Sequence, residues 1–429
     1  MTTQHVPGDA QAPEPARVDV LIVGGGIGGL ASAVALTRAG LTCRVLEQAP
    51  AFGEVGAGLQ IAPNCTRILR EWDLFDEIAE LGVLPRSIVM RDAVDGEELT
   101  RLDLVDAEKR YGAPYVVIHR SDLHGTLLRA AQRLGVDLVT DCAVTAVEQD
   151  DHGARAISAG RVDTADLLLG ADGLHSLVRP LFSDDQPVSS AYVAYRGAVP
   201  IDTVRGNDIS LDDVVCYVGP GSHFVQYPLR GGEMFNQVAV FESPKALAGF
   251  EDWGTPDELD AAFAGTCEQV RIGLPHMWRD RWWRMFDRDP IDTWVSGRIA
   301  LTGDAAHPPL QYLAQGAVMA IEDAYILTHH ATAHRDASGR VDWTAALAGY
   351  ESVRPAHCRR VLSTARKWGE LWHVAGDRRR WRNEVLRARD VHDYSFVDWL
   401  YGPTATQPAE LAPMFEPIPY SPLTAPTAS

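Results

Sequence analysis

The 429-residue chain lacks an apolar run near the roughly 20 residues that a spanning helix needs, so no integral membrane association is expected. Residues 1–16 lack the positively charged start of a secretory signal and are predicted to form a disordered leader. Basic residues are also scarce, because 39 Lys and Arg stand against 58 Asp and Glu, for a formal net charge of -19. Such an acidic protein is not expected to bind nucleic acid, which needs a basic surface.

Patterns for metals and disulfides are missing as well. The six cysteines are scattered without a CxxC spacing, and the 14 histidines form no HExxH pattern. We therefore expect reduced thiols, a cytoplasmic location and no metal site. The hydrophobic share of 46% is ordinary for a soluble protein, and the length suffices for two or three domains.

A strand–turn–helix–strand unit begins at residue 18. Residues 18–23 and 41–46 are predicted strands, residues 30–38 a helix, and Gly24–Gly29 is a GxGxxG turn between them. In nucleotide-binding folds the three glycines allow a tight turn, close approach of a pyrophosphate, and packing of helix on strand. Gly24, Gly26 and Gly29 are thus predicted to hold a pyrophosphate at the helix start, and Glu47 to accept hydrogen bonds from a ribose.

Two further glycine motifs lie far along the chain. The sequence GADGLHSLVR at residues 170–179 follows an apolar strand at 165–169, and Gly303-Asp304 follows a strand at 298–302. Taken singly, Asp172-Gly173 is also compatible with a simple strand-end turn and Asp304 with a helix cap. Nucleotide signatures at such distant places suggest one large cofactor, FAD.

The three motifs in this order closely resemble the signatures of the single-component (group A) flavoprotein aromatic hydroxylases, over roughly residues 18–375. The resemblance implies an α/β fold like that of p-hydroxybenzoate hydroxylase. A Rossmann-like FAD-binding domain is interleaved there with a β-rich substrate domain and followed by C-terminal helices. The motifs also imply a set of residues for the FAD site, namely Arg120, Asp172, Gly173, Gly303, Asp304 and Gly316. Of these, Asp304 would bind the ribityl chain, Arg120 the flavin nucleotide, and Asp172 would lie where FAD and the nicotinamide nucleotide pass.

The domain boundaries follow from this resemblance and from a region of strand-like alternation at residues 189–242. The FAD-binding domain is expected at residues 17–85, 110–183 and 286–375, and the substrate domain at 86–109 and 184–285. Helices are expected at 65–81, 120–134 and 376–401, and a Pro-rich extended or disordered tail at 402–429. The basic run Arg378–Arg382 is expected on a solvated helix face, with acidic lipid or a second subunit as alternative contacts.

Within the group, residues 223–230 and residues 308–317, the latter followed by Glu322-Asp323-Ala324, resemble the 3-hydroxybenzoate 6-hydroxylases, although salicylate 1-hydroxylases share much of the second stretch. In the first subfamily a His, a Tyr and a Gln line the pocket beside the flavin ring. The resemblance carries these roles to His223, Tyr227 and Gln311. Gln315 departs from it, because a small residue is expected before Gly316.

The activity implied is FAD-dependent, NAD(P)H-driven hydroxylation of a phenolic aromatic acid by O₂, through a flavin C4a-hydroperoxide. The favoured reaction converts 3-hydroxybenzoate to 2,5-dihydroxybenzoate (gentisate), and decarboxylating 1-hydroxylation of salicylate to catechol is the alternative. A neutral histidine can accept the phenol proton, so His223 is the candidate base and Tyr227 would relay or orient. Gln311 would hold the phenol oxygen or a carboxylate, for which Arg196 and a backbone amide are further candidates.

Other interpretations stay open. His223 and Tyr227 lie four residues apart on a strand and so share a face, which is also compatible with a packed pair without a catalytic role. The chain could be a flavin oxidoreductase that acts on another substrate without oxygenation, or a binding protein without redox chemistry. The complete set of nucleotide motifs disfavours the last. A homodimer is compatible with the sequence.

Overall fold

The structure is a computed structural model that describes residues 15–53, 56, 58–206 and 209–415. The predicted leader therefore lies almost wholly outside the described residues, as does the end of the tail. The strands are β1 Val18–Val23, β2 Cys43–Leu46, β3 Gly58–Ile61, β4 Ser87–Asp92, β5 Glu98–Asp103, β6 Val116–His119, β7 Asp137–Val139, β8 Val144–Asp150, β9 Gly153–Ser158, β10 Arg161–Gly170, β11 Val188–Pro200, β12 Val214–Gly219, β13 Ser222–Leu229, β14 Met234–Glu242, β15 Trp283–Asp287, β16 Val295–Ser296 and β17 Ile299–Leu301. The α-helices are α1 Ile27–Arg38, α2 Pro63–Glu71, α3 Phe75–Leu81, α4 Leu104–Tyr111, α5 Arg120–Arg133, α6 Pro244–Leu247, α7 Pro256–Phe263, α8 Glu268–Arg271, α9 Gly316–Ala333, α10 Trp343–Trp372, α11 Gly376–Arg387, α12 Asp398–Tyr401 and α13 Pro408–Phe415.

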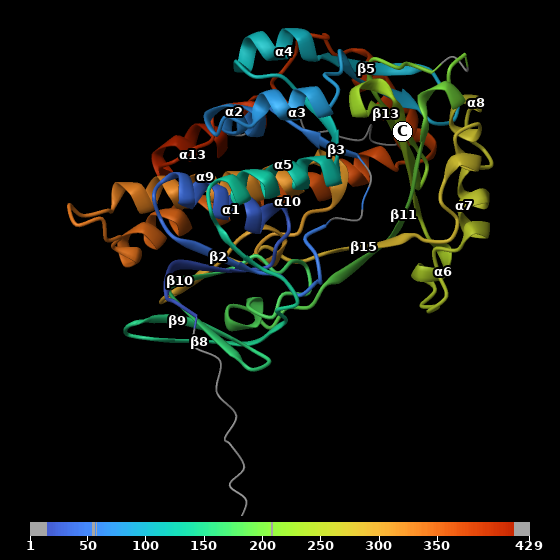
Figure 1. The fold of residues 1–429 in the computed structure, drawn as a ribbon. Helices are drawn as coiled ribbons and strands as arrows, with labels where there is room; N and C mark the ends of the chain where they lie inside the picture. The colour runs from blue at the N-terminus through green and yellow to red at the C-terminus, as the bar shows by residue number, and fades with distance from the viewer. Residues whose placement is uncertain (1–14, 54–55, 57, 207–208, 416–429) are drawn as a thin grey trace, which may run out of the picture.

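The first sheet has the order β16-β17-β10-β1-β2-β7, and the β8–β9 hairpin extends it from β10. Its centre is parallel, since β1 pairs with β10 and β2 in parallel, and β10 pairs so with β17. β1 reads VDVLIV and its last four residues are buried, as expected for a parallel strand covered on both faces. In Figure 1 the helices α1, α5, α9 and α10 form a layer above this sheet.

The topology of this sheet explains why distant motifs converge. The glycine turn follows β1, the segment with Asp172 follows β10, and Gly303 follows β17. Because β17, β10 and β1 are neighbours and run parallel, their carboxyl ends meet at one edge of the sheet. Ligands of open α/β sheets bind outside these carboxyl ends.

The second sheet is mostly antiparallel, with the order β15-β11-β14-β13-β12-β4-β5. The short helices α6, α7 and α8 cover its outer face at the edge of the molecule (Figure 1). Phe224, Phe241 and Phe263 belong to the apolar cluster on that side. The register places the side chains of His223 and Tyr227 on the opposite face, and Arg196, which aligns with Val238 and through it with Val225, joins them there.

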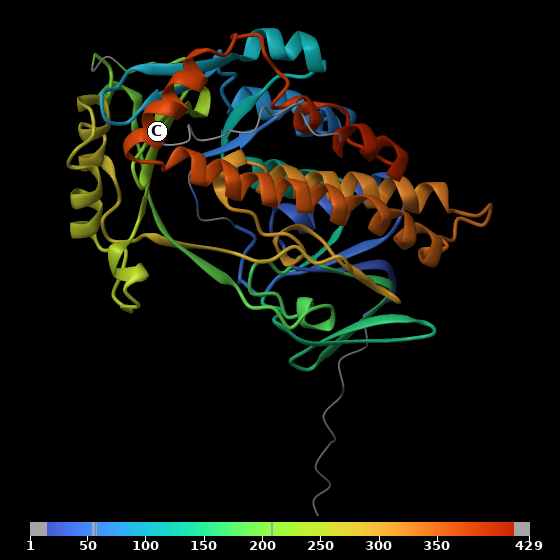
Figure 2. The same ribbon diagram turned by 180° about the vertical axis from the view of Figure 1, so that it is seen from behind.

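The C-terminal helices connect the two sheets. The 30-residue α10 runs along the back of the molecule beside α9 (Figure 2), and α11 contacts β5. Asp92, fully buried at the end of β4, accepts hydrogen bonds from Arg379 at 2.7 Å, Arg382 at 3.1 Å and the Asn383 amide at 2.6 Å. The expectation of a solvated face for the basic run is therefore wrong for part of it. Arg382 is 1% exposed because it anchors α11, while Arg378 and Arg380 are exposed.

Two other expectations need correction. The helix predicted at residues 65–81 is two helices, α2 and α3, separated where Asp73 adopts a left-handed conformation with φ 57°. The tail is not extended throughout, because residues 408–415 form α13 and Leu411 is buried. The Thr404 hydroxyl also donates to buried Glu322 at 3.2 Å. Among the described residues, no helix is both long and apolar enough to cross a membrane.

The anchor at Asp92 can be tested by Asp92→Asn. The change leaves the buried Arg382 guanidinium without its counter-charge, so the free energy of unfolding should fall by about 3 kcal/mol or more. Urea denaturation of the purified protein measures this. Arg380→Gln, at an exposed position of the same helix, should change the value by at most about 0.5 kcal/mol. Equal stability of both variants would refute the anchoring role.

Candidate active site

The glycine turn after β1 is shaped by close backbone contacts. Gly24 has φ +107°, and a Cβ there would lie 2.4 Å from the carbonyl oxygen of Ala171. A Cβ on Gly29 would lie 1.9 Å from the oxygen of Gly24, so Gly29 lets α1 pack against the strand. Gly26 is the N-cap of α1 and lines a large cavity. The first N–H groups of α1 therefore lie where an anion can reach them.

Glu47 lies beside this turn at the end of β2. Its carboxylate accepts the backbone N–H of Gly25 at 2.7 Å and that of Ala49 at 2.8 Å. A carboxylate has about four acceptor positions, so these two bonds orient Glu47 and still leave acceptor capacity toward the cavity that it lines. The arrangement is compatible with the expected contact to a ribose.

The segment after β10 is closed by its own aspartate. Asp172 accepts the hydroxyl of Ser176 at 2.5 Å and the N–H of Leu177 at 2.7 Å, and Gly173 adopts φ +78°. The carboxylate thus has the turn-forming role that the sequence left open. Asp172 and Gly173 both line the cavity as well.

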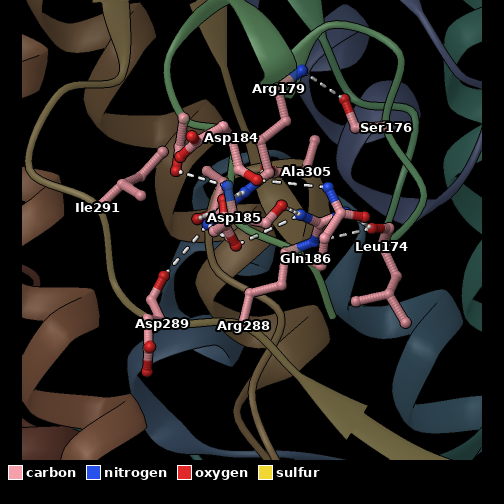
Figure 3. A network of polar contacts seen from close by, with 12 residues as sticks. Leu174, Ser176, Arg179, Asp184, Asp185, Gln186, Arg288, Asp289, Ile291 and Ala305 are labelled. Carbon is pink, nitrogen blue, oxygen red and sulfur yellow. Dashed lines mark hydrogen bonds and ion pairs between the residues drawn. The ribbon is translucent and has the colours of Figure 1, made fainter. Parts of the chain in front are cut away.

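Arg179, the last residue of the same motif, ties it to the segment after β17. Its guanidinium donates to the carbonyl oxygens of Ala305 at 2.9 Å and Ala306 at 2.7 Å, and pairs with Asp185 at 2.8 Å. Figure 3 shows Arg179 and Arg288 on either side of Asp185. Arg179 is fully buried, so this network holds two of the nucleotide motifs in one rigid arrangement.

The loop after β17 is held in place by α9. Asp323, buried in α9, accepts the N–H of Gly303 at 2.9 Å, the Thr302 hydroxyl at 3.1 Å and His307 Nε2 at 2.6 Å. Its other oxygen accepts Arg354 Nε at 2.8 Å. The backbone at Gly303, with φ +58°, is therefore fixed by a charged acceptor.

A buried cluster joins Asp323, Arg354 and His307 to Glu322 and His357, and its members carry charges despite their burial. Burial alone would raise the pKa of Glu322, but Arg354 and then His357 lower it to about 2. Burial opposes a charge on His307, yet Asp323 beside it raises the pKa of His307 well above the usual value. The group is thus a buried network of compensated charges, costly to disrupt at any one member.

Three atoms of the same cluster have metal-ligand character. A nitrogen of His307, a carboxylate oxygen of Asp323 and the sulfur of Cys358 lie within 4.8 Å of one another. Arg354 already contacts both ends of the group, with Nε 2.8 Å from Asp323 and Nη2 3.4 Å from the Cys358 sulfur. Because a guanidinium supplies the positive charge there, we interpret the cluster as structural.

A continuous cavity of about 2270 Å³ joins the nucleotide motifs to the second sheet. Of the residues expected in the site, all but Gly29 line it: Gly24, Gly26, Glu47, Arg120, Asp172, Gly173, His223, Tyr227, Gly303, Asp304, Gln311 and Gly316. A Cβ on Gly316 would make an ordinary contact of 3.5 Å with Pro309, so packing within the protein does not itself require glycine at this helix start. A cavity of this volume, lined by the glycine turn and by the start of a helix, fits a dinucleotide such as FAD.

His223 lines the part of this cavity that the second sheet forms. It is 1% exposed, its Nε2 lies 3.4 Å from the amide nitrogen of Gln311, and its Nδ1 lies 2.8 Å from Nε2 of His373. Burial, and then the neighbouring His373, lowers the pKa of His223 well below its usual value. His223 is therefore neutral at physiological pH and able to accept a proton.

Tyr227 and Arg196 form a separate end of the same floor. Burial raises the pKa of Tyr227, and Arg196 beside it partly offsets the effect. Burial lowers the pKa of Arg196; Tyr227 beside it opposes this effect, and Arg120 adds to it. Within the described part of the chain, no hydrogen bond joins Tyr227 to His223, whose ring partner is His373.

Gln315 lies at the N-cap of α9, where a small residue is expected. It is 2% exposed, and its side-chain oxygen accepts the Asn64 amide at 3.2 Å. Asn64 also donates to Glu322 at 2.9 Å. The larger side chain is thus accommodated by a polar contact with α2.

Sequence reasoning missed several residues that shape the site. Asp323 and Arg179 lay inside the quoted motifs, but their structural roles depend on partners far away in the chain. His373 and Asp92 carry no local signal. Their partners come from β13 and α11, respectively.

Comparisons with known proteins agree with this architecture. The family model described as FAD binding domain matches residues 17–365. The chain is 38% identical over 402 residues to the 3-hydroxybenzoate 6-hydroxylase of Polaromonas naphthalenivorans (strain CJ2), covering 90% of this chain and 96% of that protein. It is 37% identical to the 3-amino-4-hydroxybenzoate 2-monooxygenase of Streptomyces cremeus, covering 92% and 98%. The crystal structure of Klebsiella pneumoniae HpxO complexed with FAD and uric acid is similar with a TM-score of 0.76 and 27% identity, covering 86% of this chain and 93% of that chain.

The fold and the cofactor expected from the sequence are thereby confirmed. Both sheets, the interleaved chain course and the C-terminal helices match the expected architecture, and FAD is the cofactor of the matched family. The chain belongs to the FAD-binding domain family and, within it, to the group A flavoprotein aromatic hydroxylases.

Proposed function

We propose that this monooxygenase converts 3-hydroxybenzoate to 2,5-dihydroxybenzoate, with NADH or NADPH as reductant and O₂ as the oxygen source. The observation that carries the proposal is a floor with two distinct polar ends. One end offers a neutral imidazole and an amide, and the other offers a guanidinium beside a tyrosine. A phenol and a carboxylate on one ring match these two ends.

The phenol end consists of His223 and Gln311. A neutral imidazole nitrogen accepts the phenol proton, which makes the ring more electron-rich and thus a better nucleophile toward oxygen. The amide of Gln311, on the loop that follows Gly303, can hold the phenol oxygen while the proton leaves. When bound, FAD supplies the reductive activation of O₂.

The carboxylate end consists of Arg196 with Tyr227. Among the residues that the structure describes, no carboxylate pairs with Arg196, and its guanidinium lies 5.5 Å from the ring centre of Trp283. A largely buried cation that faces a cavity without a protein anion is strongly favoured to bind one from a ligand. Tyr227 can donate its hydroxyl to the same carboxylate.

The FAD contacts are proposed for the residues that line the other half of the cavity. Gly24, Gly26 and Gly29 would form the pyrophosphate turn, and Glu47 would accept the ribose hydroxyls. Arg120, Asp172, Gly173, Gly303, Asp304 and Gly316 would complete the FAD site. We propose the domain boundaries given for these two halves on the same basis.

The named relatives act on differently substituted rings, as their names 3-hydroxybenzoate 6-hydroxylase and 3-amino-4-hydroxybenzoate 2-monooxygenase say. Both names specify a substrate whose ring carries a carboxylate and a hydroxyl. Salicylate, with adjacent groups, fits two separated ends less well and remains the alternative. A flavin oxidoreductase without oxygenation is the other.

The substrate can be tested with a panel of 3-hydroxybenzoate, salicylate and 3-amino-4-hydroxybenzoate. We expect 3-hydroxybenzoate to accelerate NADH oxidation and to appear as gentisate by chromatography. His223→Ala should lower hydroxylation about 100-fold or more while flavin reduction by NADH stays similar. Formation of catechol from salicylate would change the assigned substrate to salicylate. If no phenol stimulates NADH oxidation, the hydroxylase function is rejected.

The carboxylate end can be tested with Arg196→Gln and a neutral substrate analogue. Loss of the guanidinium should raise the KM for 3-hydroxybenzoate about tenfold or more, because a hydrogen bond to a charged group contributes roughly 1.5–3 kcal/mol. The KM for 3-hydroxybenzamide, which has no carboxylate, should change little. An equal rise for both compounds would mean that Arg196 shapes the pocket without binding the carboxylate.

A further inference from the structure

We propose that His373 is a positioning residue that keeps Nε2 of His223 free to accept the substrate proton and then carries that proton toward solvent. This inference rests on the proposed function, because it concerns the phenol end of the same cavity. It assigns a role to the C-terminal end of α10, which the nucleotide motifs do not reach.

The first step is the contact itself. Nδ1 of His223 and Nε2 of His373 lie 2.8 Å apart, and the two rings meet edge to edge, with centroids 5.1 Å apart and planes 19° apart. Each neutral imidazole has one donor and one acceptor nitrogen, so one ring must donate and the other accept. The tautomers of the two histidines are therefore coupled.

Gln311 selects between the two tautomers. Its amide nitrogen, a donor, faces Nε2 of His223 at 3.4 Å. With the amide in this orientation, Nε2 of His223 keeps its lone pair, and we infer that the proton of the neutral ring is on Nδ1, which donates to His373. This is the tautomer in which Nε2 can act as a base.

The proton path then balances without another reactant. The phenol O–H bond breaks and an N–H bond forms at Nε2 of His223. The Nδ1–H bond of His223 breaks as Nε2–H forms on His373, and Nδ1–H of His373 releases its proton to water. His373 is half-buried whereas His223 is 1% exposed, so the pair leads from the buried floor outward.

The packing of His373 gives this path a fixed geometry. Its ring stacks on Tyr192 of β11 at 4.6 Å, and its carbonyl oxygen accepts the N–H of Gly221 at 3.0 Å. Arg382 donates to the carbonyl oxygen of the preceding Trp372 at 2.6 Å. Both the second sheet and α11 thus hold the histidine in place.

The charges around His373 favour release over storage of the proton. Burial, and then Arg382, lowers the pKa of His373 to about 3. Asp92 pairs with Arg382 and partly compensates its charge. On the remaining sides the titratable groups are Tyr192, held by Glu242, and Tyr312 of the loop with Gln311; burial raises the pKa of both tyrosines, so both are neutral.

The test follows the ionisation of 5-hydroxy-2-nitrobenzoate, a nitrophenol with the same meta arrangement of hydroxyl and carboxylate. Its phenolate absorbs visible light, so stopped-flow mixing with the oxidised holoenzyme measures proton removal directly. His373→Ala and His373→Gln should slow this step about tenfold or more, because neither side chain can pass on a proton. Glutamine keeps a polar contact to His223, so a loss in both variants indicates proton transfer rather than packing.

Two controls sharpen the result. Added imidazole should restore the rate of His373→Ala, and His329→Gln, at an exposed histidine, should match the unaltered enzyme. The deficit should be largest below the pKa of the dye and vanish above it, where the dye arrives already ionised. A packing defect would not produce this dependence on pH, because it would slow the reaction on both sides of the pKa of the dye.

Several outcomes would overturn the proposal. The first is an equal rate of dye ionisation in all enzymes. The second is a slower rate in the His373 variants that is explained by weaker binding of the dye and that imidazole does not restore. The third is that the unaltered enzyme does not ionise the dye. The proposed function fails separately. If the dye results hold but no member of the substrate panel is hydroxylated, the proton path stands and the substrate assignment falls.

Discussion

The active-site architecture depends on one buried carboxylate. Asp323 accepts the backbone N–H of Gly303, the Thr302 hydroxyl and His307, and is balanced by Arg354. A buried carboxylate is tolerated only where such donors compensate it, so the cluster forms as a unit or not at all. The loop that it fixes begins at the cofactor half of the cavity and continues within a few residues to the substrate half. A single constraint therefore sets the position of both.

The parallel sheet supplies the second part of the arrangement. The three nucleotide motifs follow three neighbouring strands, and Arg179 connects the second motif to the third through the carbonyl oxygens of Ala305 and Ala306. The antiparallel sheet contributes a floor of alternating side chains, with His223 and Tyr227 facing the cavity. Helix α11, anchored on Asp92, and the end of α10 then complete the wall around His223.

The sequence predicted the parts whose causes are local. The contact that requires Gly29 lies within one turn, and β1 ends in the apolar run Val20–Val23, so both could be read directly from the sequence. Gly24 belongs to the same motif, but the backbone that it approaches is that of Ala171, far along the chain. The break between α2 and α3 was missed because apolar spacing continues across Asp73. The tail was misjudged because its composition gave no sign that Leu411 would find a buried position. Partners such as His373 for His223, or Asp92 for Arg382, leave no trace in local pattern, since only the fold brings them together.

The most direct measurement is the affinity of Asp323→Asn for FAD, followed by flavin fluorescence during dilution. If the carboxylate fixes the loop at Gly303, the dissociation constant should rise about tenfold or more, since a hydrogen bond to a charged acceptor contributes roughly 1.5–3 kcal/mol. Asp202→Asn, at an exposed carboxylate, should bind FAD like the unaltered protein. Unchanged affinity in a folded Asp323→Asn variant would contradict the account, because the loop would then be held by something other than this carboxylate.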